Sequence, residues 1–264
     1  MTAIEALGLR KTYGSGSGAV EAVKGVDFAI DYGQTVALVG ESGSGKSTIA
    51  KMLLLLEQPS GGEIRLDGRP AGVRGVALRA HRSAVQMVFQ DPFASLNPFH
   101  SIEHHIARPL LLSGRTRGRR QTRTAVAELL ERVHLTPAGD FLSRRPHELS
   151  GGQRQRVAIA RALAPAPRVL IADEPVSMLD VSIRLGVLRL LADIQREDDL
   201  AVLYITHDLA TARHFSDEIL VMYRGEIVER GAADDVILRP QHEYTRRLAA
   251  AAPDPHRRFA EAPS

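Results

Sequence analysis

The sequence of 264 residues contains no cysteine. This absence excludes disulfide bonds, cysteine-ligated zinc and iron–sulfur clusters. Long hydrophobic runs are also missing. The longest purely aliphatic stretch, Met52–Leu56, is far shorter than the roughly 18 apolar residues of a membrane-spanning helix. The N-terminal segment lacks the apolar region and cleavage site of a secretory signal, so we expect a cytosolic chain.

An excess of charge of one sign is missing as well. The chain has 34 Lys and Arg against 31 Asp and Glu, and this net charge of +3 excludes the positive field of a nucleic-acid-binding protein. One basic run, Arg115–Arg123, is concentrated but has no interleaved aromatic residues. It indicates a solvated helix start, and a phosphate-binding patch is the alternative. The ordinary composition, 44% hydrophobic and 25% charged, excludes disorder along the whole chain.

Hydrophobic periodicity predicts an α/β fold. Residues alternate apolar and polar over 3–10 and 20–30, which is typical of half-buried antiparallel strands. Later apolar runs alternate with helical patterns, and this order predicts a mainly parallel sheet covered on both faces. Further strands are expected at 35–39, 63–69 (a hairpin with a DG turn), 84–89, 169–172, 201–205 and 218–222. Helices are expected at 49–57, 102–112, 122–135 and 181–197.

The strongest motif is a glycine loop between a predicted strand and a predicted helix. The loop matches G-x-x-x-x-G-K-[ST] and consists of Gly40, Glu41, Ser42, Gly43, Ser44, Gly45, Lys46, Ser47 and Thr48. The glycines allow backbone N–H groups to curl around phosphate oxygens, and the helix N-terminus adds positive potential. Lys46, one of only four lysines, neutralises the outer phosphates. Ser47 supplies a hydroxyl for Mg²⁺.

A second motif supplies carboxylates. The apolar run Arg168–Glu174 predicts a strand that ends in two acids. We expect Asp173 to hold the magnesium shell. Glu174, on the opposite face of the pleat, is placed to take a proton from an attacking water.

The segment that starts at Leu149, LSGGQRQRVAIARAL, permits two interpretations. Ser150 at the N-cap and Gln153 three positions later predict a capping box, which requires no ligand. Gly151 and Gly152 also leave backbone donors open to an anion such as a terminal phosphate. The residues alone favour neither interpretation.

These motifs together resemble the ATP-binding subunit of ABC transporters, and the resemblance covers roughly residues 3–250. GESGSGKST and VLIADE are similar to the Walker A and Walker B motifs of that family, and LSGGQ is similar to its signature. Gln90 matches the Q-loop, residues 177–180 the D-loop and His207 the switch histidine. Tyr13 lies where the family has an adenine-stacking aromatic residue.

The resemblance implies a P-loop, RecA-like core with an N-terminal antiparallel β subdomain and an inserted α-helical subdomain. It implies an ABC ATPase domain over residues 1–250, with the core at 1–91 and 166–240 and the helical subdomain at about 92–165. Residues 241–264 would form a C-terminal extension, whose polar, Pro-rich end over 253–264 is expected to be loosely ordered.

The resemblance also implies a head-to-tail dimer with ATP and Mg²⁺ between two subunits. One chain would contribute the catalytic residues Glu174, His207, Gln90 and Lys46, and the metal ligands Ser47, Gln90 and Asp173. The other chain would present Ser150, Gly151, Gly152 and Gln153 to the γ-phosphate. This arrangement decides between the two interpretations of LSGGQ. Asp180 would pack against the opposite Walker A loop.

Three segments resemble the peptide and nickel importer branch, in its second, shorter ATPase type: residues 89–98, 173–182 and 242–248. Met178 departs from the Ala common there, and Glu243 departs from a common Pro. The implied partners are a second ATPase subunit (a related chain or a second copy), two permeases and an extracytoplasmic solute-binding protein, without nucleic acid. The location would be the cytoplasmic face of the membrane. The cargo, whether peptides, nickel or oligosaccharides, stays open.

Other nucleotide-binding classes fit less well. The alternative is a soluble ABC-type ATPase of translation or DNA repair, but those proteins carry two ATPase domains or long coiled coils. The segment between Gln90 and Leu149 has room for a compact helical insert only. A P-loop GTPase needs an NKxD motif, which is excluded because Asn97, the only Asn, is followed by Pro. A P-loop kinase would not explain LSGGQ, residues 177–180 and His207 together.

Overall fold

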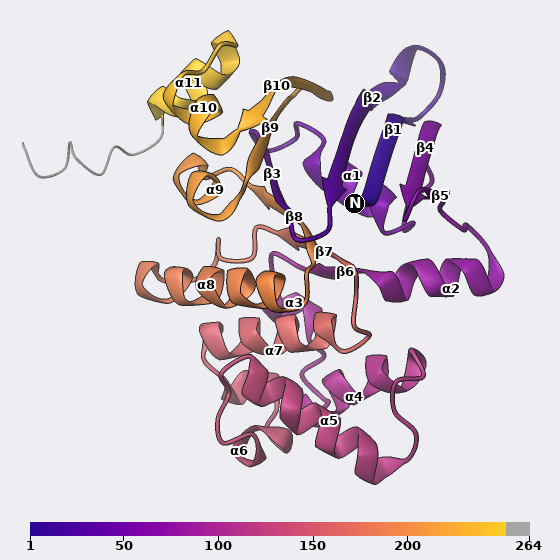
Figure 1. Ribbon diagram of the computed structural model, residues 1–264, viewed down its shortest axis with the longest axis vertical. Coiled ribbons are helices and arrows are strands. Elements are labelled where there is room, and N and C mark those ends of the chain that lie inside the picture. The colour runs from indigo at the N-terminus through magenta and orange to yellow at the C-terminus, as the bar shows by residue number, and fades with distance from the viewer. Residues whose placement is uncertain (252–264) are drawn as a thin grey trace, which may run out of the picture.

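A four-stranded antiparallel sheet forms the N-terminal part of the protein (Figure 1). The computed structural model describes residues 1–251, and the expectation for 253–264 lies outside them. The strand order is β2-β1-β4-β5. The Asp67–Gly68 turn between β4 and β5 has positive φ at both residues, as a tight hairpin turn requires. The strands are β1 (Thr2–Tyr13), β2 (Val20–Asp31), β4 (Gly61–Leu66) and β5 (Arg69–Pro70).

The second sheet has six strands in the order β10-β9-β3-β8-β7-β6. Every neighbouring pair is parallel except β10 with β9, which confirms the expected mainly parallel sheet. Because β3, β8 and β7 are adjacent and parallel, the loops after them meet at one edge of the sheet. The strands are β3 (Thr35–Val39), β6 (Val85–Val88), β7 (Val169–Asp173), β8 (Ala201–Thr206), β9 (Glu218–Tyr223) and β10 (Glu226–Ala232).

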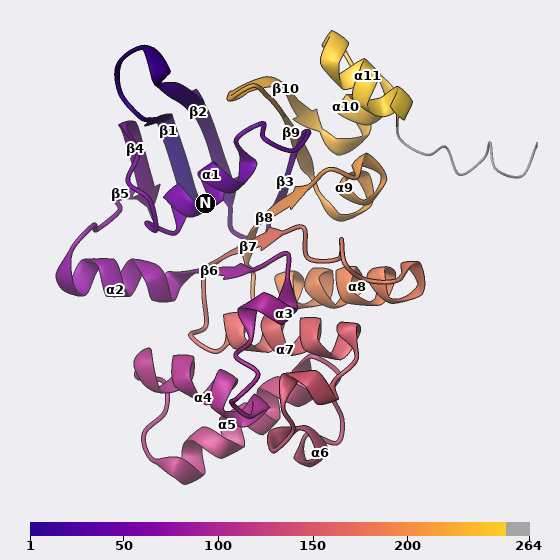
Figure 2. The same cartoon turned by 180° about the vertical axis from the view of Figure 1, so that it is seen from behind.

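Helices cover the second sheet and extend beyond it (Figure 2). The helices α4, α5 and α6 gather at the end of the molecule opposite the antiparallel sheet, and α7 and α8 lie between them and the strands (Figure 1). The helices are α1 (Lys46–Leu53), α2 (Gly75–Ala84), α3 (Pro92–Ser95), α4 (Ile102–Leu112), α5 (Arg119–Arg132), α6 (Gly139–Leu142), α7 (Gly151–Leu163), α8 (Val181–Glu197), α9 (Leu209–Phe215), α10 (Ala233–Leu238) and α11 (Glu243–Ala251).

Two predicted helices have different bounds in the structure. The helix expected at 49–57 runs from Lys46 to Leu53, because Gly45 is a left-handed N-cap and Leu55 has a φ of +51°. The helix expected at 122–135 runs from Arg119 to Arg132, since it starts directly after Gly118 and the chain turns at His134, where φ is +59°. The sequence did not predict α2, α3, α6, α10, α11 or strand β10. The subdomain boundaries at 92–165 stay a prediction.

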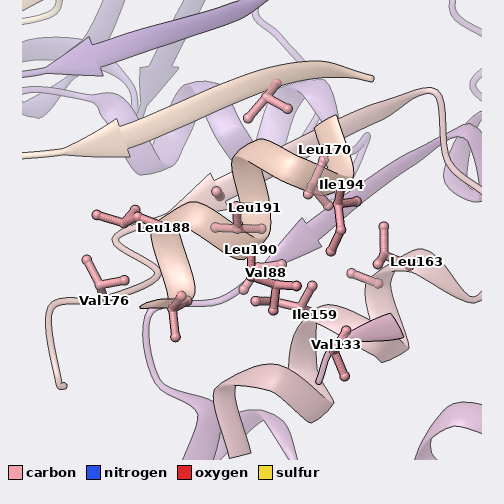
Figure 3. Packing of buried hydrophobic residues seen from close by; sticks show 14 of the residues in the cluster. Val88, Val133, Ile159, Leu163, Leu170, Val176, Leu188, Leu190, Leu191 and Ile194 are labelled. Atoms are coloured by element: carbon pink, nitrogen blue, oxygen red, sulfur yellow. The ribbon is translucent and has the colours of Figure 1, made fainter. Parts of the chain in front are cut away.

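The core lies on both faces of the six-stranded sheet. Along β3, Val36 and Leu38 pack toward the antiparallel sheet and α1, whereas Ala37 and Val39 pack toward the large helices. This alternation is the period of two expected of a strand. Figure 3 shows the hydrophobic cluster on the side of Ala37 and Val39, between the sheet and helices α7 and α8. It includes Val88, Leu170, Ile159, Leu163, Leu190 and Ile194. Burial on both faces holds β3, β7 and β8, and therefore the loops that follow them, in fixed relative positions.

Candidate functional site

The glycine loop Gly40–Thr48 joins β3 to α1, as its pattern predicts. Gly45 has a φ of +113°, in the region that favours glycine, and a Cβ there would lie 2.4 Å from the carbonyl oxygen of Ala22. Only glycine therefore allows the loop to enter α1 at Lys46. Ser47 is exposed on the first turn of the helix, so its hydroxyl is accessible.

Lys46 lies over the loop that it belongs to. Its Nζ donates hydrogen bonds to the carbonyl oxygens of Gly40 at 2.7 Å and Glu41 at 2.8 Å. Burial lowers the pKa of Lys46, while the nearby carboxylates of Glu174 and Asp173 work in the opposite direction. The buried cation is thus held at the mouth of the loop, where phosphate oxygens can replace the two carbonyl acceptors.

Glu174 connects two further residues that the sequence singled out. Gln90 Nε2 donates to one carboxylate oxygen of Glu174 at 3.0 Å, and His207 Nδ1 lies 3.0 Å from the other. Gln90 follows β6, Glu174 follows β7 and His207 follows β8. The three side chains therefore come from the carboxyl ends of neighbouring parallel strands. They place a carboxylate, an amide and an imidazole side by side at one edge of the sheet.

The turn after β7 places Glu174 differently from the expectation. The sequence places Glu174 on the opposite face of a continuing pleat, but β7 ends at Asp173, and Glu174 has a φ of +44°. The backbone N–H of Glu174 donates to the carbonyl of Ile205 at 2.9 Å, which fixes this turn against β8. Glu174 thus leaves the strand, and tertiary contacts set its direction.

The residues that the sequence predicts as magnesium ligands include two oxygen donors, Ser47 and Asp173. Burial, followed by the charge of Glu174, raises the pKa of Asp173, so this carboxylate gains from a nearby cation. Asp173 and the exposed hydroxyl of Ser47 fit Mg²⁺, which binds through one or two protein groups together with phosphates and waters. No group of three or more His, Asp or Glu that can hold a metal by itself occurs within residues 1–251. The donor set therefore suits a metal that arrives with a nucleotide.

The signature segment forms the predicted capping box. Ser150 N–H donates to Gln153 Oε1 at 3.0 Å, and Gln153 N–H donates to Ser150 Oγ at 3.3 Å. Gly151 and Gly152 occupy the first turn of α7. In the part of the chain that the structure describes, no hydrogen bond or ion pair joins this segment to Gly40–Thr48. Within one chain, the structure does not bring the two predicted phosphate-binding loops together.

The other predicted residues, Tyr13 and Asp180, lie outside the group formed by Gln90, Glu174 and His207. The hydroxyl of Tyr13, at the end of β1, bonds to Glu57, which raises the pKa of Tyr13, and Lys11 Nζ lies 5.1 Å from the centre of its ring. The adenine-stacking role stays a prediction. Asp180 precedes α8 at an exposed N-cap position, and Met178 is 55% exposed.

The basic run forms the loop before α5 and the first turns of that helix, and its arginines are exposed, as expected of a solvated helix start. The run borders a hollow of about 1130 Å³ that also reaches Arg132 and Pro167. By comparison, the hollow at Glu174 and His207 is about 50 Å³. Among the predicted catalytic residues, Gln90 and His207 are exposed, Glu174 is partly buried and Lys46 is buried.

Tyr244 is a residue that the sequence analysis did not single out. Its hydroxyl accepts the backbone N–H of Glu41, the second residue of the glycine loop, at 2.9 Å. Tyr244 belongs to the segment HEYTRRL, which resembles the importer branch. No pattern within that segment predicts a contact with Glu41, which lies 203 positions earlier in the chain.

A family model described as ABC transporter matches residues 23–177. The chain is 45% identical over 242 residues to the di/tripeptide transport ATP-binding protein DppF of Pseudomonas aeruginosa, covering 91% of this chain and 74% of that protein. It is 49% identical over 245 residues to the glutathione import ATP-binding protein GsiA of Pectobacterium atrosepticum, covering 92% of this chain. The match spans only 39% of the length of GsiA.

Solved structures show the same fold. The dimeric post-hydrolysis structure of the ATP-binding cassette MJ0796, bound to ADP and Pi, has a TM-score of 0.77 at 31% identity and covers 87% of this chain and 98% of that one. The cbiO1 protein from Clostridium perfringens, part of the ABC transporter complex cbiONQ, has a TM-score of 0.80 at 27% identity and covers 95% of each chain. Among the described residues, no helix is long and apolar enough to cross a membrane.

Proposed function

The chain belongs to the ABC transporter family as one of its ATP-hydrolysing subunits, and we propose that it couples ATP hydrolysis to import through partner permeases. The observation that carries this proposal is the position of Glu174, whose two oxygens contact Gln90 and His207 at the sheet edge next to the phosphate loop. A carboxylate there takes a proton from a water that attacks the γ-phosphorus, and the bond between the β- and γ-phosphates breaks to leave ADP and phosphate.

Lys46, Ser47 and Asp173 bind the nucleotide and its magnesium ion in this proposal. Lys46 leaves the carbonyls of Gly40 and Glu41 and contacts the phosphates. Ser47 and Asp173 hold Mg²⁺, which neutralises charge on the phosphate oxygens. Lys46 and Ser47 lie on the first turn of α1, and the charges of Lys46 and Asp173 act on each other, which supports this assignment.

Two chains complete each site. The capping box of Ser150 and Gln153 presents an open helix N-terminus that does not contact the phosphate loop of its own chain. A head-to-tail dimer brings it to the γ-phosphate held by the other chain, with Asp180 and the exposed Met178 at the interface. ATP therefore closes the dimer, and hydrolysis removes the bridging phosphate and lets the dimer relax. The second ATPase is a related chain or another copy.

The permease contact lies beside Gln90. A hollow of about 550 Å³ opens between β6 and α4, and its walls include the exposed side chains of Phe89, Leu56 and Leu112. An apolar segment of a permease that fills this hollow touches Phe89, the residue before Gln90. Movement of Gln90 with the γ-phosphate is thereby transmitted to the permease, and the chain is peripheral at the cytoplasmic face of the membrane.

Peptides are the proposed cargo class, with nickel or oligosaccharides as the other candidates of this branch. The relatives named for peptide and glutathione import support this choice over a soluble ATPase of translation or DNA repair. An extracytoplasmic solute-binding protein delivers the cargo. No nucleic acid is involved.

The test is to tag the chain, solubilise membranes in mild detergent and identify stoichiometric partners by mass spectrometry. The expected result is two permeases and a second ATPase, with ATP hydrolysis that rises when the loaded solute-binding protein is added. Recovery of ribosomes, DNA or soluble partners alone would overturn the proposal. A parallel preparation of the Glu174→Gln variant should recover the same partners without stimulated hydrolysis, which separates assembly from catalysis.

A further inference from the structure

The C-terminal segment of the described chain reaches the phosphate loop directly. Tyr244 in α11 is only 3% exposed, and its hydroxyl accepts the backbone N–H of Glu41 at 2.9 Å. Figure 1 shows α10 and α11 packed beside the end of β9 and β10. A residue near the end of the described chain thus contacts the second residue of the loop after β3.

A stacked pair of rings fixes the Tyr244 hydroxyl. The ring of Tyr223 stacks on that of Tyr244, with centroids 4.2 Å apart and an angle of 29° between the planes. Tyr223 is the last residue of β9, which pairs in parallel with β3 so that Val221 lies opposite Val39. The strand register therefore brings Tyr223, and the ring stacked on it, next to the start of the loop.

The start of α11 is anchored independently. The carboxylate of Glu229 in β10 accepts the backbone N–H groups of Gln241 at 2.7 Å and His242 at 2.9 Å. Two backbone groups on one carboxylate are a strong, directional attachment. The helix that carries Tyr244 is thus fixed to the sheet before its hydroxyl meets the loop.

Both backbone polar groups of Glu41 are engaged. The N–H group donates to Tyr244, and the carbonyl oxygen accepts from Lys46 Nζ at 2.8 Å. When Lys46 moves to the phosphates, the Glu41 carbonyl keeps the hydrogen bond from the Ser44 N–H at 3.2 Å, which lies within the loop. The bond that the Glu41 N–H donates to Tyr244 then ties the loop to a residue outside it. A restrained loop loses less conformational freedom when a ligand binds than a mobile loop does.

We infer that Tyr244 is a positioning residue of the nucleotide site, whose hydroxyl holds the start of the phosphate loop in its binding conformation. This inference rests on the proposed function, because it takes the loop Gly40–Thr48 to be the ATP site. It assigns the segment HEYTRRL a role in nucleotide affinity in addition to the packing of the C-terminal segment.

The test compares two variants that each lose one hydroxyl from the same ring stack. Tyr244→Phe keeps the ring and deletes the acceptor for Glu41 N–H. Tyr223→Phe is the matched control, because the Tyr223 hydroxyl makes no hydrogen bond within residues 1–251. The measurements are the dissociation constant of a fluorescent ATP analogue, the hydrogen exchange of the Glu41 amide and the thermal midpoint of each full-length chain.

The dissociation constant for Tyr244→Phe should rise about two- to tenfold, the range that a single lost hydrogen bond supplies. Exchange at Glu41 should accelerate, and kcat at saturating ATP should stay near the wild-type value because no reacting atom touches Tyr244. Tyr223→Phe should match the wild type in affinity and exchange.

Wild-type affinity of Tyr244→Phe would overturn the inference, as would an equal loss in both variants. If Tyr244→Phe has a lower thermal midpoint, the titration is made well below that midpoint, where exchange at Glu41 separates a local loosening of the loop from general destabilisation. Failure of the wild-type chain itself to bind the analogue would instead count against the proposed function.

Discussion

His207 Nδ1 lies 3.0 Å from Glu174 Oε1, and this contact joins the residue after β8 to the residue after β7. A carboxylate only accepts hydrogen bonds, so the imidazole carries the shared proton on Nδ1. Gln90 donates to the other oxygen of Glu174. The carboxylate is thereby oriented from both sides, while its remaining lone pairs can still accept a proton from water.

Replacement of Glu174 by Gln should slow ATP hydrolysis by about 10²- to 10⁴-fold, because the amide keeps the shape of the side chain but cannot act as a base. Nucleotide binding should persist, so the variant should accumulate ATP-bound dimer. Phosphate release and size-exclusion chromatography with ATP measure the two effects. The control is Glu197→Gln, which alters an exposed carboxylate paired with Arg132. Unchanged turnover of Glu174→Gln in the assembled complex would remove Glu174 from the catalytic role.

Lys46→Ala should weaken ATP binding about ten- to a hundredfold, the effect of losing charge-assisted hydrogen bonds to the phosphates. Lys24→Ala is the control for the loss of one lysine charge, since Lys24 pairs with Glu226 at 3.2 Å and lies outside the glycine loop and α1. Isothermal titration with ATP measures both affinities. Equal affinity of the two variants would show that the buried cation at the loop does not bind phosphate.

Gly152→Ala should destabilise the fold more than Gly151→Ala. A Cβ at position 152 would lie 2.6 Å from Cγ2 of Ile183, whereas a Cβ at 151 would meet Leu179 at an ordinary 3.5 Å. Overpacking of this kind costs about 1–3 kcal/mol, and the exchange of Gly for Ala in a helix favours the folded state by roughly 0.5–1 kcal/mol. Urea unfolding of both variants measures the difference. Equal midpoints would mean that α8 moves away from α7 without cost.

The stability of the protein should fall as the pH drops below the usual histidine pKa of about 6.5. His81 is 3% exposed, its Nε2 donates to the carbonyl of Leu53 at 2.7 Å, and burial lowers its pKa. The folded state disfavours the charged imidazole of His81. The free energy of unfolding therefore keeps its full value above the pKa of His81 in the unfolded chain, and it decreases as the pH falls from that pKa toward the lower pKa of the folded state.

His81→Gln removes the titration and leaves an amide donor for Leu53. Between pH 7.5 and 5.5 the wild type should lose more free energy of unfolding than this variant, as measured by denaturant unfolding. Asp173, whose raised pKa acts with the opposite sign, is present in both chains and cancels in the comparison. Parallel losses would exclude His81 as the group responsible.

The sequence determined the local features of this protein. The glycine loop, the capping box of Ser150 and Gln153, and the strand that ends at Val39 all depend on residues within a few positions of one another. Such features follow from backbone freedom, side-chain capping and hydrophobic period, so they can be predicted without a partner. The comparisons confirm the family resemblance, and the residue roles that the resemblance implies stay predictions.

Only the tertiary structure decided the features that depend on distant residues. The left-handed turn at Glu174 is fixed by Ile205 in another strand. At the turn that follows α1, the carbonyl of Leu55 accepts a hydrogen bond from Arg82 at 3.0 Å. Helix α2 was missed because it begins at Gly75 without a side-chain N-cap or an acidic first turn, and it is exposed along most of its length. The contact of Tyr244 with Glu41 depends on the parallel register of β9 and β3. The strand order depends on packing against both faces of the sheet at once. No local pattern in the sequence encodes these long-range contacts.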